Sequence, residues 1–257
     1  MNGQSQIDSI NRKTYANGKV LDYYVGLTEL FPAEKVLFEK LSAKIENARI
    51  LDIGVGGGRT TQYLLSLGAE YTGLDYVPEF IERVKKKYQT GNFIAGDARD
   101  LKAFSDETFD FVLSSYNGID AVLHDDRLKI LNEIKRVLKK GGMLMFSSHN
   151  RDYRHFRKPY WLTEFKFDQL FVKNLMSYVF FLPRHLRMRK HEFFNDEYAI
   201  VNDYDHRFSL LVYYISVDRQ IKQLEDLGLS GIEAYSTKGD QVSADKDSFW
   251  IYYLASK

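Results

Sequence analysis

The stretch that decides the fold is ILDIGVGGGRTTQYLL, residues 50–65, in which a short apolar run leads through four glycines into a helical pattern. Glycine loses more conformational freedom on folding than any other residue, so four glycines at positions 54–58 need a physical reason. Either a ligand or another stretch of backbone approaches these positions so closely that a side chain would not fit. At the junction of a strand and a helix, exposed backbone N–H groups also favour a ligand. The stretch therefore predicts a ligand-binding loop after the first strand.

Outward from this loop, short β-rich runs alternate with helical patterns, which is typical of βαβ units and a parallel sheet. The first five strands are expected at 49–54, 71–76, 92–97, 109–115 and 143–149, and helices at 31–47, 59–67, 78–89 and 125–140. The continuous apolar character of the strands indicates that both faces of the sheet are covered. After residue 149 the alternation stops until a helix at 216–228. Two β-rich runs follow, at 230–236 and 249–257, and their helix-free connection predicts antiparallel neighbours.

Composition sets broad limits. The chain has 257 residues and 44% hydrophobic content, enough for one domain with an insertion. Lys and Arg number 36 against 35 Asp and Glu, so the whole chain has no strong attraction to nucleic acid. It contains no cysteine, which excludes disulfides, thiolate metal sites and cysteine nucleophiles. The N-terminus lacks the pattern of a signal peptide, and the longest uncharged apolar run, 175–183, is too short to span a bilayer. We therefore expect a soluble, cytoplasmic protein.

The glycine spacing separates two classes of nucleotide-binding protein. A dinucleotide fingerprint, G-x-G-x-x-G, would need its third glycine at Arg59 or Thr61. The chain instead reads Asp52-x-Gly54-x-Gly56-x-Gly58. With this motif it resembles the class I S-adenosylmethionine-dependent methyltransferases, whose first motif is E/D-x-G-x-G-x-G at the end of the first strand. The resemblance covers about 45–150 and returns at 216–257.

The resemblance implies a doubly wound, Rossmann-like α/β fold with a seven-stranded, mainly parallel sheet whose last strand is antiparallel. We expect a single domain over 1–257. Its parts would be an N-terminal helical cap at 1–47, a cofactor-binding core at 48–150, an inserted lid at 151–208 and the rest of the core at 209–257.

The resemblance also assigns cofactor contacts. Asp75, about 20 residues after the glycines, stands where an acid would accept hydrogen bonds from both ribose hydroxyls. Tyr76 follows it and could lie against adenine. Asp97 and Ala98, in the motif GDA, would bind the adenine amino group and face the ring.

The remaining assignments concern the methionine part of S-adenosylmethionine. Asp52 would hold the ammonium, while the glycines Gly54, Gly56 and Gly58 belong to the motif that passes beneath it. Ser115 and Tyr116, which close the fourth strand, would line the methionine part and the transferred methyl group. Arg59 could reach the cofactor carboxylate or be an ordinary surface arginine.

Methyl transfer from a sulfonium needs alignment of nucleophile and methyl, and exclusion of water. A base is needed when the acceptor is a hydroxyl or a protonated amine. His149, at the end of the fifth strand, is the first candidate because imidazole titrates near neutral pH, and Tyr116 is the second catalytic candidate. A structural hydrogen bond is the alternative role for His149. His124 with Asp125 and Asp126 could suggest a metal site, but the acids more simply cap the next helix, and we expect no metal.

The insertion is unusually basic and aromatic. Residues 151–190 contain ten Lys or Arg, three Asp or Glu and ten aromatic residues. Apolar residues at helical spacing in 161–182 predict one amphipathic helix or two short ones. Basic and aromatic side chains together suit a phosphorylated or nucleotide-linked acceptor. The segment could instead cover the sheet or a partner subunit, rest on a membrane surface, or bind RNA. RNA is disfavoured because no separate recognition domain is present.

The predicted reaction is therefore methyl transfer from S-adenosylmethionine to an oxygen or nitrogen of an anionic small molecule. A phosphorylated or nucleotide-linked sugar of surface polysaccharide or natural-product synthesis is the candidate acceptor, which would place the protein in carbohydrate biosynthesis. The alternatives are an RNA methyltransferase and a non-catalytic S-adenosylmethionine-binding protein. A homodimer is left open.

Overall fold

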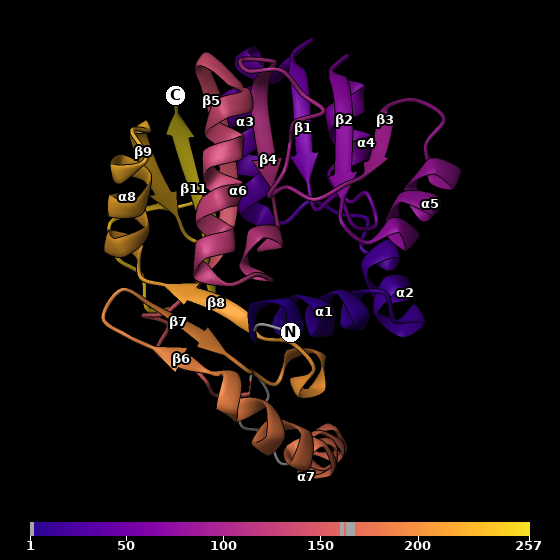
Figure 1. The fold of residues 1–257 in the computed structure, drawn as a ribbon, viewed down its shortest axis with the longest axis vertical. Coiled ribbons are helices and arrows are strands. Elements are labelled where there is room, and N and C mark those ends of the chain that lie inside the picture. Colours follow the sequence, from indigo (N-terminus) through magenta and orange to yellow (C-terminus); the bar gives the residue numbers. More distant parts are fainter. Residues whose placement is uncertain (1–2, 160–161, 163–167) are drawn as a thin grey trace.

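The centre of the computed structural model, which describes residues 3–159, 162 and 168–257, is a twisted, mainly parallel sheet (Figure 1). Seven strands form its body in the order β3-β2-β1-β4-β5-β11-β9. Their bounds are β1 Arg49–Ile53, β2 Glu70–Asp75, β3 Asn92–Ala95, β4 Phe109–Ser114, β5 Leu138–Asn150, β9 Ser230–Tyr235 and β11 Trp250–Ser256. The first five run parallel, and β11 runs antiparallel to both β5 and β9. This confirms the predicted fold class.

Helices cover both faces of the sheet (Figure 1). One layer holds α3 Pro32–Ile45, α4 Thr61–Ser66 and α5 Pro78–Lys87, and the other holds α6 His124–Val137 and α8 Val217–Asp226. Side chains of β1 alternate between the layers: Ile50 packs with α3, whereas Leu51 and Ile53 pack with α6. All three are buried, which confirms that the apolar strands are covered on both faces.

Short strands extend this body at two places. β10 Gln241–Val242 pairs with β9. β6 Phe193–Phe194 and β7 Tyr198–Val201 pair antiparallel, β7 pairs with β8 Val212–Ile215, and β8 runs parallel to the end of β5 at His149. The sequence analysis missed β6, β7 and β8 because runs of two to four residues are too short to show alternation.

The boundary between α6 and β5 was predicted wrongly. The helix expected at 125–140 ends at Val137, and β5 begins at Leu138 rather than at residue 143. Gly141 and Gly142 directly follow the range expected for the helix. They lie inside β5, where its pairing with β4 shifts register between Phe109 and Phe111. Glycine is typical of such a bulge, which a sequence pattern does not separate from a helix end.

The N-terminal segment and the insertion lie at the carboxyl ends of the strands (Figure 1). α1 Gly3–Tyr15 and α2 Gly18–Gly26 cross this edge of the sheet. The buried side chain of Asn11 ties α1 to the body by donating to the carbonyls of Ala121 (2.7 Å) and Leu211 (2.8 Å). In the insertion, α7 Gln169–Met188 packs against the short helix η4 Asp205–Phe208. Most of the first part of the predicted amphipathic segment, 161 and 163–167, lies outside the described residues.

Candidate active site

The glycine loop after β1 forms one wall of a crevice at the carboxyl ends of β1, β2 and β4. Gly54 and Gly56 line this strand-end crevice with φ angles of +74° and +51°, which other residues rarely adopt. The Gly56 N–H donates to Asp75 Oδ2 at 2.9 Å. These two glycines therefore let the backbone turn beneath a ligand.

The other two glycines serve packing. A Cβ on Gly57 would overlap the backbone of α2, 2.5 Å from Val25 Cα, although Gly57 also borders the crevice. A Cβ on Gly58 would lie 2.6 Å from Cε2 of Tyr88, the residue that follows α5, and Gly58 does not line the crevice. The bare backbone of Gly58 accommodates Tyr88, whose hydroxyl donates to the Gly58 carbonyl at 2.7 Å.

Asp75 ends β2 and faces the crevice. Its two carboxylate oxygens accept from the N–H groups of Gly56 and Val77, each at 2.9 Å, so the side chain is fixed in one orientation. The side chain is buried among crevice residues, and this burial raises the pKa of Asp75 to about 6. A buried carboxylate fixed in this way is a strong acceptor for hydroxyl groups of a ligand.

Asp52, in β1, stands deeper in the same crevice. Its Oδ2 accepts from the hydroxyls of Thr60 (2.7 Å) and Tyr71 (2.8 Å). Burial raises its pKa to about 6, although these hydrogen bonds act in the opposite direction. The crevice thus contains two buried carboxylates whose charge a cationic or hydroxyl-bearing ligand would satisfy.

Arg59 is not a surface arginine. It pairs with the fully buried Glu34 of α3, with one Nη2 to Oε1 distance of 2.7 Å, and its guanidinium stacks on Phe31 at 4.1 Å. Both Arg59 and Ser115 line the crevice. The sequence analysis missed Glu34, since a glutamate in the first turn of a helix ordinarily satisfies the helix end.

Tyr76, Asp97 and Ala98 line a second part of the crevice beneath α1. The hydroxyl of Tyr76 is buried and has no hydrogen-bond partner among the described residues. Asp97 is held by Arg99, whose Nε donates to its two carboxylate oxygens at 2.9 and 3.0 Å. The role of Arg99 was not predicted. Because Arg99 occupies part of the carboxylate, only part of the hydrogen-bond accepting capacity of Asp97 is left for a ligand.

The two parts of the crevice, about 710 and 460 Å³ with their open space, share Gly54, Asp75 and Tyr76. They fit an elongated ligand whose polar middle lies over Asp75. A cationic end would meet Asp52, and a ring at the other end would meet Ala98 and the unpaired hydroxyl of Tyr76. The residues present therefore suit a nucleoside joined to an amino-acid tail.

A second, larger cavity, which we call the aromatic cavity, opens beside the crevice and has a volume of about 1620 Å³ including its open mouth. Six of its aromatic lining residues are Tyr23, Tyr153, Tyr204, Tyr214, Phe249 and Trp250. Arg157 and Lys158 also line it. Tyr116 borders both spaces, and it and Asn117 have left-handed φ angles of +56° and +61°. Such strained residues are typical of functional sites.

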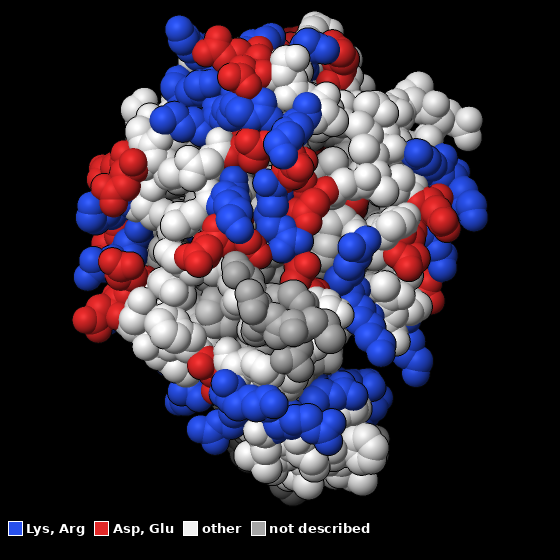
Figure 2. Space-filling view, viewed as in Figure 1, with Lys and Arg blue, Asp and Glu red and all other residues white. Residues whose placement is uncertain are grey.

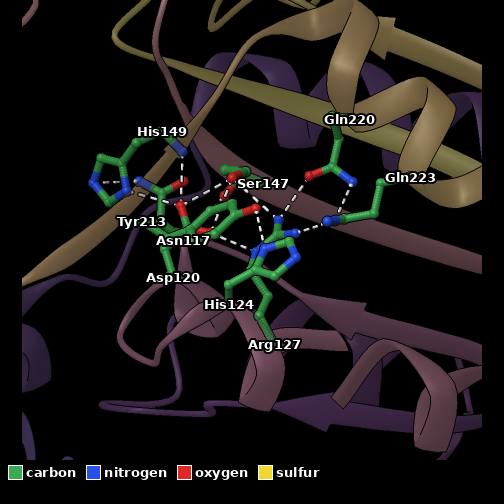
Figure 3. Close-up of polar contacts among 10 residues, drawn as sticks. Asn117, Asp120, His124, Arg127, Ser147, His149, Tyr213, Gln220 and Gln223 are labelled. Carbon is green, nitrogen blue, oxygen red and sulfur yellow. Dashed lines mark hydrogen bonds and ion pairs between the residues drawn. The ribbon is translucent and has the colours of Figure 1, made fainter. Parts of the chain in front are cut away.

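His149 lies in the wall of the aromatic cavity and pairs with Asp120 (Figure 3). The His149 Nδ1 lies 2.8 Å from Asp120 Oδ2, which also accepts from the His149 backbone N–H at 2.7 Å. Because this carboxylate only accepts, it places the ring proton on Nδ1 and leaves Nε2 as the basic nitrogen. The Asn117 Nδ2 lies 3.3 Å from that Nε2.

A buried network fixes Asp120 in turn (Figure 3). Ser148 Oγ donates to Asp120 Oδ1 at 2.9 Å, and Arg127 Nε lies 3.3 Å from the same oxygen. Arg127 is fully buried, contacts Gln220 Oε1 at 2.7 Å from α8, and stacks on Tyr213 at 4.5 Å. The sequence analysis missed this network, because its members come from five elements spread along the chain: the 3₁₀ helix η1 Gly118–Asp120, α6, β5, β8 and α8.

The cluster of His124 with Asp125 and Asp126, at which the sequence analysis expected no metal, is a separate case. His124 bonds to Tyr213 at 2.9 Å and Asp126 to Arg99 at 2.9 Å, so the two point to different partners. No group of three or more His, Asp or Glu side chains that could hold a metal ion occurs among the described residues.

Comparison with known proteins identifies the family. Residues 51–146 match a family model described as a methyltransferase domain. An uncharacterized protein of Methanocaldococcus jannaschii is 31% identical over 167 residues, which cover 59% of this chain and 69% of that protein. A ubiquinone biosynthesis O-methyltransferase of Cereibacter sphaeroides is 35% identical over 144 residues, 53% of this chain and 54% of that protein. The chain spans about half or less of the length of the first curated relatives it matches.

Among solved structures, the 1,6-didemethyltoxoflavin-N1-methyltransferase of Burkholderia thailandensis aligns with a TM-score of 0.63 at 15% identity, over 100% of this chain and 91% of that chain. That structure contains 1,6-didemethyltoxoflavin and S-adenosylhomocysteine. At this identity the likeness concerns the fold.

Proposed function

Because this chain belongs to the class I S-adenosylmethionine-dependent methyltransferases, we propose that it transfers a methyl group from S-adenosylmethionine to an oxygen or nitrogen of a small molecule. One observation carries the proposal most strongly. Tyr116 borders both the strand-end crevice and the aromatic cavity, so a methyl donor in the first would adjoin an acceptor in the second. Alignment of two reactants in this way is the main contribution a protein makes to such a displacement.

Each crevice residue would contact a different part of the cofactor. Asp75 would accept from the ribose hydroxyls, Asp52 would face the ammonium, and Tyr76 and Ala98 would enclose adenine, with Asp97 at its amino group. Bound S-adenosylmethionine supplies an electrophilic methyl group on a sulfonium. The chain's own part is to orient that group toward the aromatic cavity and to exclude water, which the aromatic residues at the junction favour.

His149 is the proposed general base. Its Nδ1 proton is held by Asp120, so Nε2 can take a proton from an acceptor hydroxyl or ammonium as the bond to the methyl group forms. Asp120 is a positioning residue, since it acts through the imidazole. Tyr116, at the junction, is proposed to position the acceptor.

The acceptor is proposed to be an anionic molecule that contains a ring. Aromatic walls suit the face of a sugar or of an aromatic ring, and Arg157 with Lys158 suits a phosphate or carboxylate. A phosphorylated or nucleotide-linked sugar remains the candidate from the sequence. The lack of cysteine suits a reducing compartment and supports a cytoplasmic location.

The test is turnover with a panel of acceptors. Purified protein is incubated with S-adenosylmethionine and with nucleotide-sugars, sugar phosphates, phenolic acids or unstructured RNA, and release of S-adenosylhomocysteine is measured. We expect turnover with at least one small molecule. Turnover with RNA alone would identify an RNA methyltransferase. Tight cofactor binding without turnover on a broadened panel would favour a non-catalytic binding protein.

Variants of the proposed base then separate chemistry from binding. Replacement of a general base lowers the rate by roughly 100-fold or more, so His149→Gln should lower kcat with unchanged affinity for S-adenosylhomocysteine. Asp120→Asn should lower kcat and shift the lower limb of the pH–rate profile. If the pH–rate profile of Asp120→Asn were unchanged, His149 would not be the base, and its role would be a structural hydrogen bond.

A further inference from the structure

The outer side of α7 carries apolar side chains that are exposed in the described part of the chain. Phe180 is 76% exposed and Met176 is 68% exposed, the two highest values among the exposed large hydrophobic side chains of the described residues. Further exposed apolar residues of α7 are Leu170, Val172, Leu175, Val179 and Leu186. The opposite side packs inward, with Met188 buried and Tyr178 in contact with Phe208 of η4. The helix therefore has one apolar face against the body and a second one exposed.

Most of these exposed residues form one continuous stripe, which we call the outer stripe of α7: Val172, Leu175, Met176, Val179, Phe180, Pro183 and Leu186. Their spacings of three and four place them on one side of the helix. Since Leu186 follows Val172 by 14 residues in α7 and each adds 1.5 Å, the stripe extends over about 20 Å. Contiguous exposed apolar surface of this kind marks an interaction site.

The charged residues of α7 itself are all basic. Within Gln169–Met188 the charged residues are Lys173, Arg184 and Arg187, with no Asp or Glu, and Arg189 and Lys190 follow directly. Arg184 and Arg207 both stack on Phe181, at 5.0 and 5.3 Å, which holds two guanidinium groups against the helix. Figure 2 shows a band of Lys and Arg above an uncharged area at the lower end of the molecule, where Figure 1 places α7.

We propose that the outer stripe of α7 docks on an anionic membrane surface, with its apolar side chains among the acyl chains and its basic residues at the headgroups. Apolar residues bordered by Lys and Arg on one long helix are the features of interfacial helices. A second copy is a poorer occupant, because it would bring Arg187 and Lys190 of two chains together without an acid on α7 to pair them. In the described part of the chain no helix is long and apolar enough to cross a membrane, so the contact lies on the surface.

The inner side of α7 links this surface to the aromatic cavity. Tyr178 and His185 line a small pocket together with Arg157, Asp203 and Tyr204. The last three also line the aromatic cavity. A docked α7 would therefore place that cavity beside the headgroup layer, where an amphiphilic acceptor could enter it. This consequence rests on the proposed function, whereas docking itself does not.

The experiment is vesicle co-sedimentation of the full chain. Vesicles of phosphatidylcholine with phosphatidylglycerol are compared with pure phosphatidylcholine, at low and high salt. We expect binding to the anionic vesicles that weakens with salt. The Met176→Asn, Phe180→Asn double variant should lower the partition coefficient by about tenfold or more. Val36→Asn, an exposed apolar residue of α3, is the matched control and should bind as the wild type does.

Charge is tested separately. Arg187→Gln with Lys190→Gln should reduce binding to anionic vesicles by about tenfold, whereas Lys102→Gln, 86% exposed and outside α7, should not. Equal sedimentation of wild type and α7 variants would overturn the proposal, as would no binding to either vesicle. Light scattering that shows a dimer lost in Met176→Asn, Phe180→Asn, without vesicle binding, would identify a second copy as the occupant and also overturn it. Vesicle binding needs no methyl acceptor, so its failure is distinct from failure of the proposed function.

Discussion

The role of Asp75 gives a quantitative test of the cofactor site. Asp75→Asn keeps the shape of the side chain but replaces one charged acceptor oxygen by an amide donor. Hydrogen bonds to charged groups contribute about 1.5 to 3 kcal/mol, so loss of one bond to a ribose hydroxyl should weaken affinity roughly 10- to 150-fold. Calorimetry with S-adenosylhomocysteine at pH 8, where the Asp75 carboxyl with its pKa of about 6 is ionised, measures this directly.

Two controls make the result interpretable. The variant also loses one acceptor for the N–H of Gly56 or Val77, worth about 1 kcal/mol, so its thermal midpoint without ligand should fall by only a few degrees. Asp106→Asn changes an acid whose side chain is 73% exposed and outside the crevice, and it should bind the cofactor as the wild type does. A folded Asp75→Asn protein with unchanged affinity would refute the ribose-binding role.

Three further predictions test pH dependence and packing. Burial raises the pKa of both Asp52 and Asp75 to about 6, so these carboxyls take up protons as the pH falls below 6. Because the folded protein then binds more protons than the unfolded chain, its stability should increase. Cofactor affinity, measured by calorimetry from pH 8 to 5, should decrease over the same range. Gly57→Ala should lower the free energy of unfolding by about 1 to 3 kcal/mol because its Cβ would overlap the α2 backbone, whereas Gly18→Ala, with open space around it, should not. Arg127→Met should cost about 3 to 5 kcal/mol in denaturant unfolding because it removes the guanidinium partner of the buried Asp120. The double variant with Asp120→Asn should recover part of this loss, and no loss in Arg127→Met would refute the pairing.

The fold was predictable because its signals are local. Each core strand is a continuous apolar run, and covered strands need both faces buried, as Ile50 and Leu51 show by packing into opposite layers. The glycine loop and the acid at the end of β2 are also local features, and a parallel sheet brings strand ends together at one edge. The positions of Asp52, Gly54 and Asp75 in a single crevice follow from that topology alone.

The rest of the site depends on contacts that no local pattern encodes. Asp120 is useful only because β5 carries His149 next to it and because Arg127, from α6, compensates its charge in the interior. Removal of such a partner leaves an isolated buried charge, which is strongly destabilising. In the sequence the same residues read as an acid in a loop and a basic residue on a helix, both ordinary at a surface. Glu34 and Arg59 illustrate the same principle at the other end of the crevice, where their pairing allows two charges to be buried together. Charged residues whose partners lie far apart in the chain are thus the part of a site that requires the structure, because only the fold distinguishes a compensated interior charge from a solvated one.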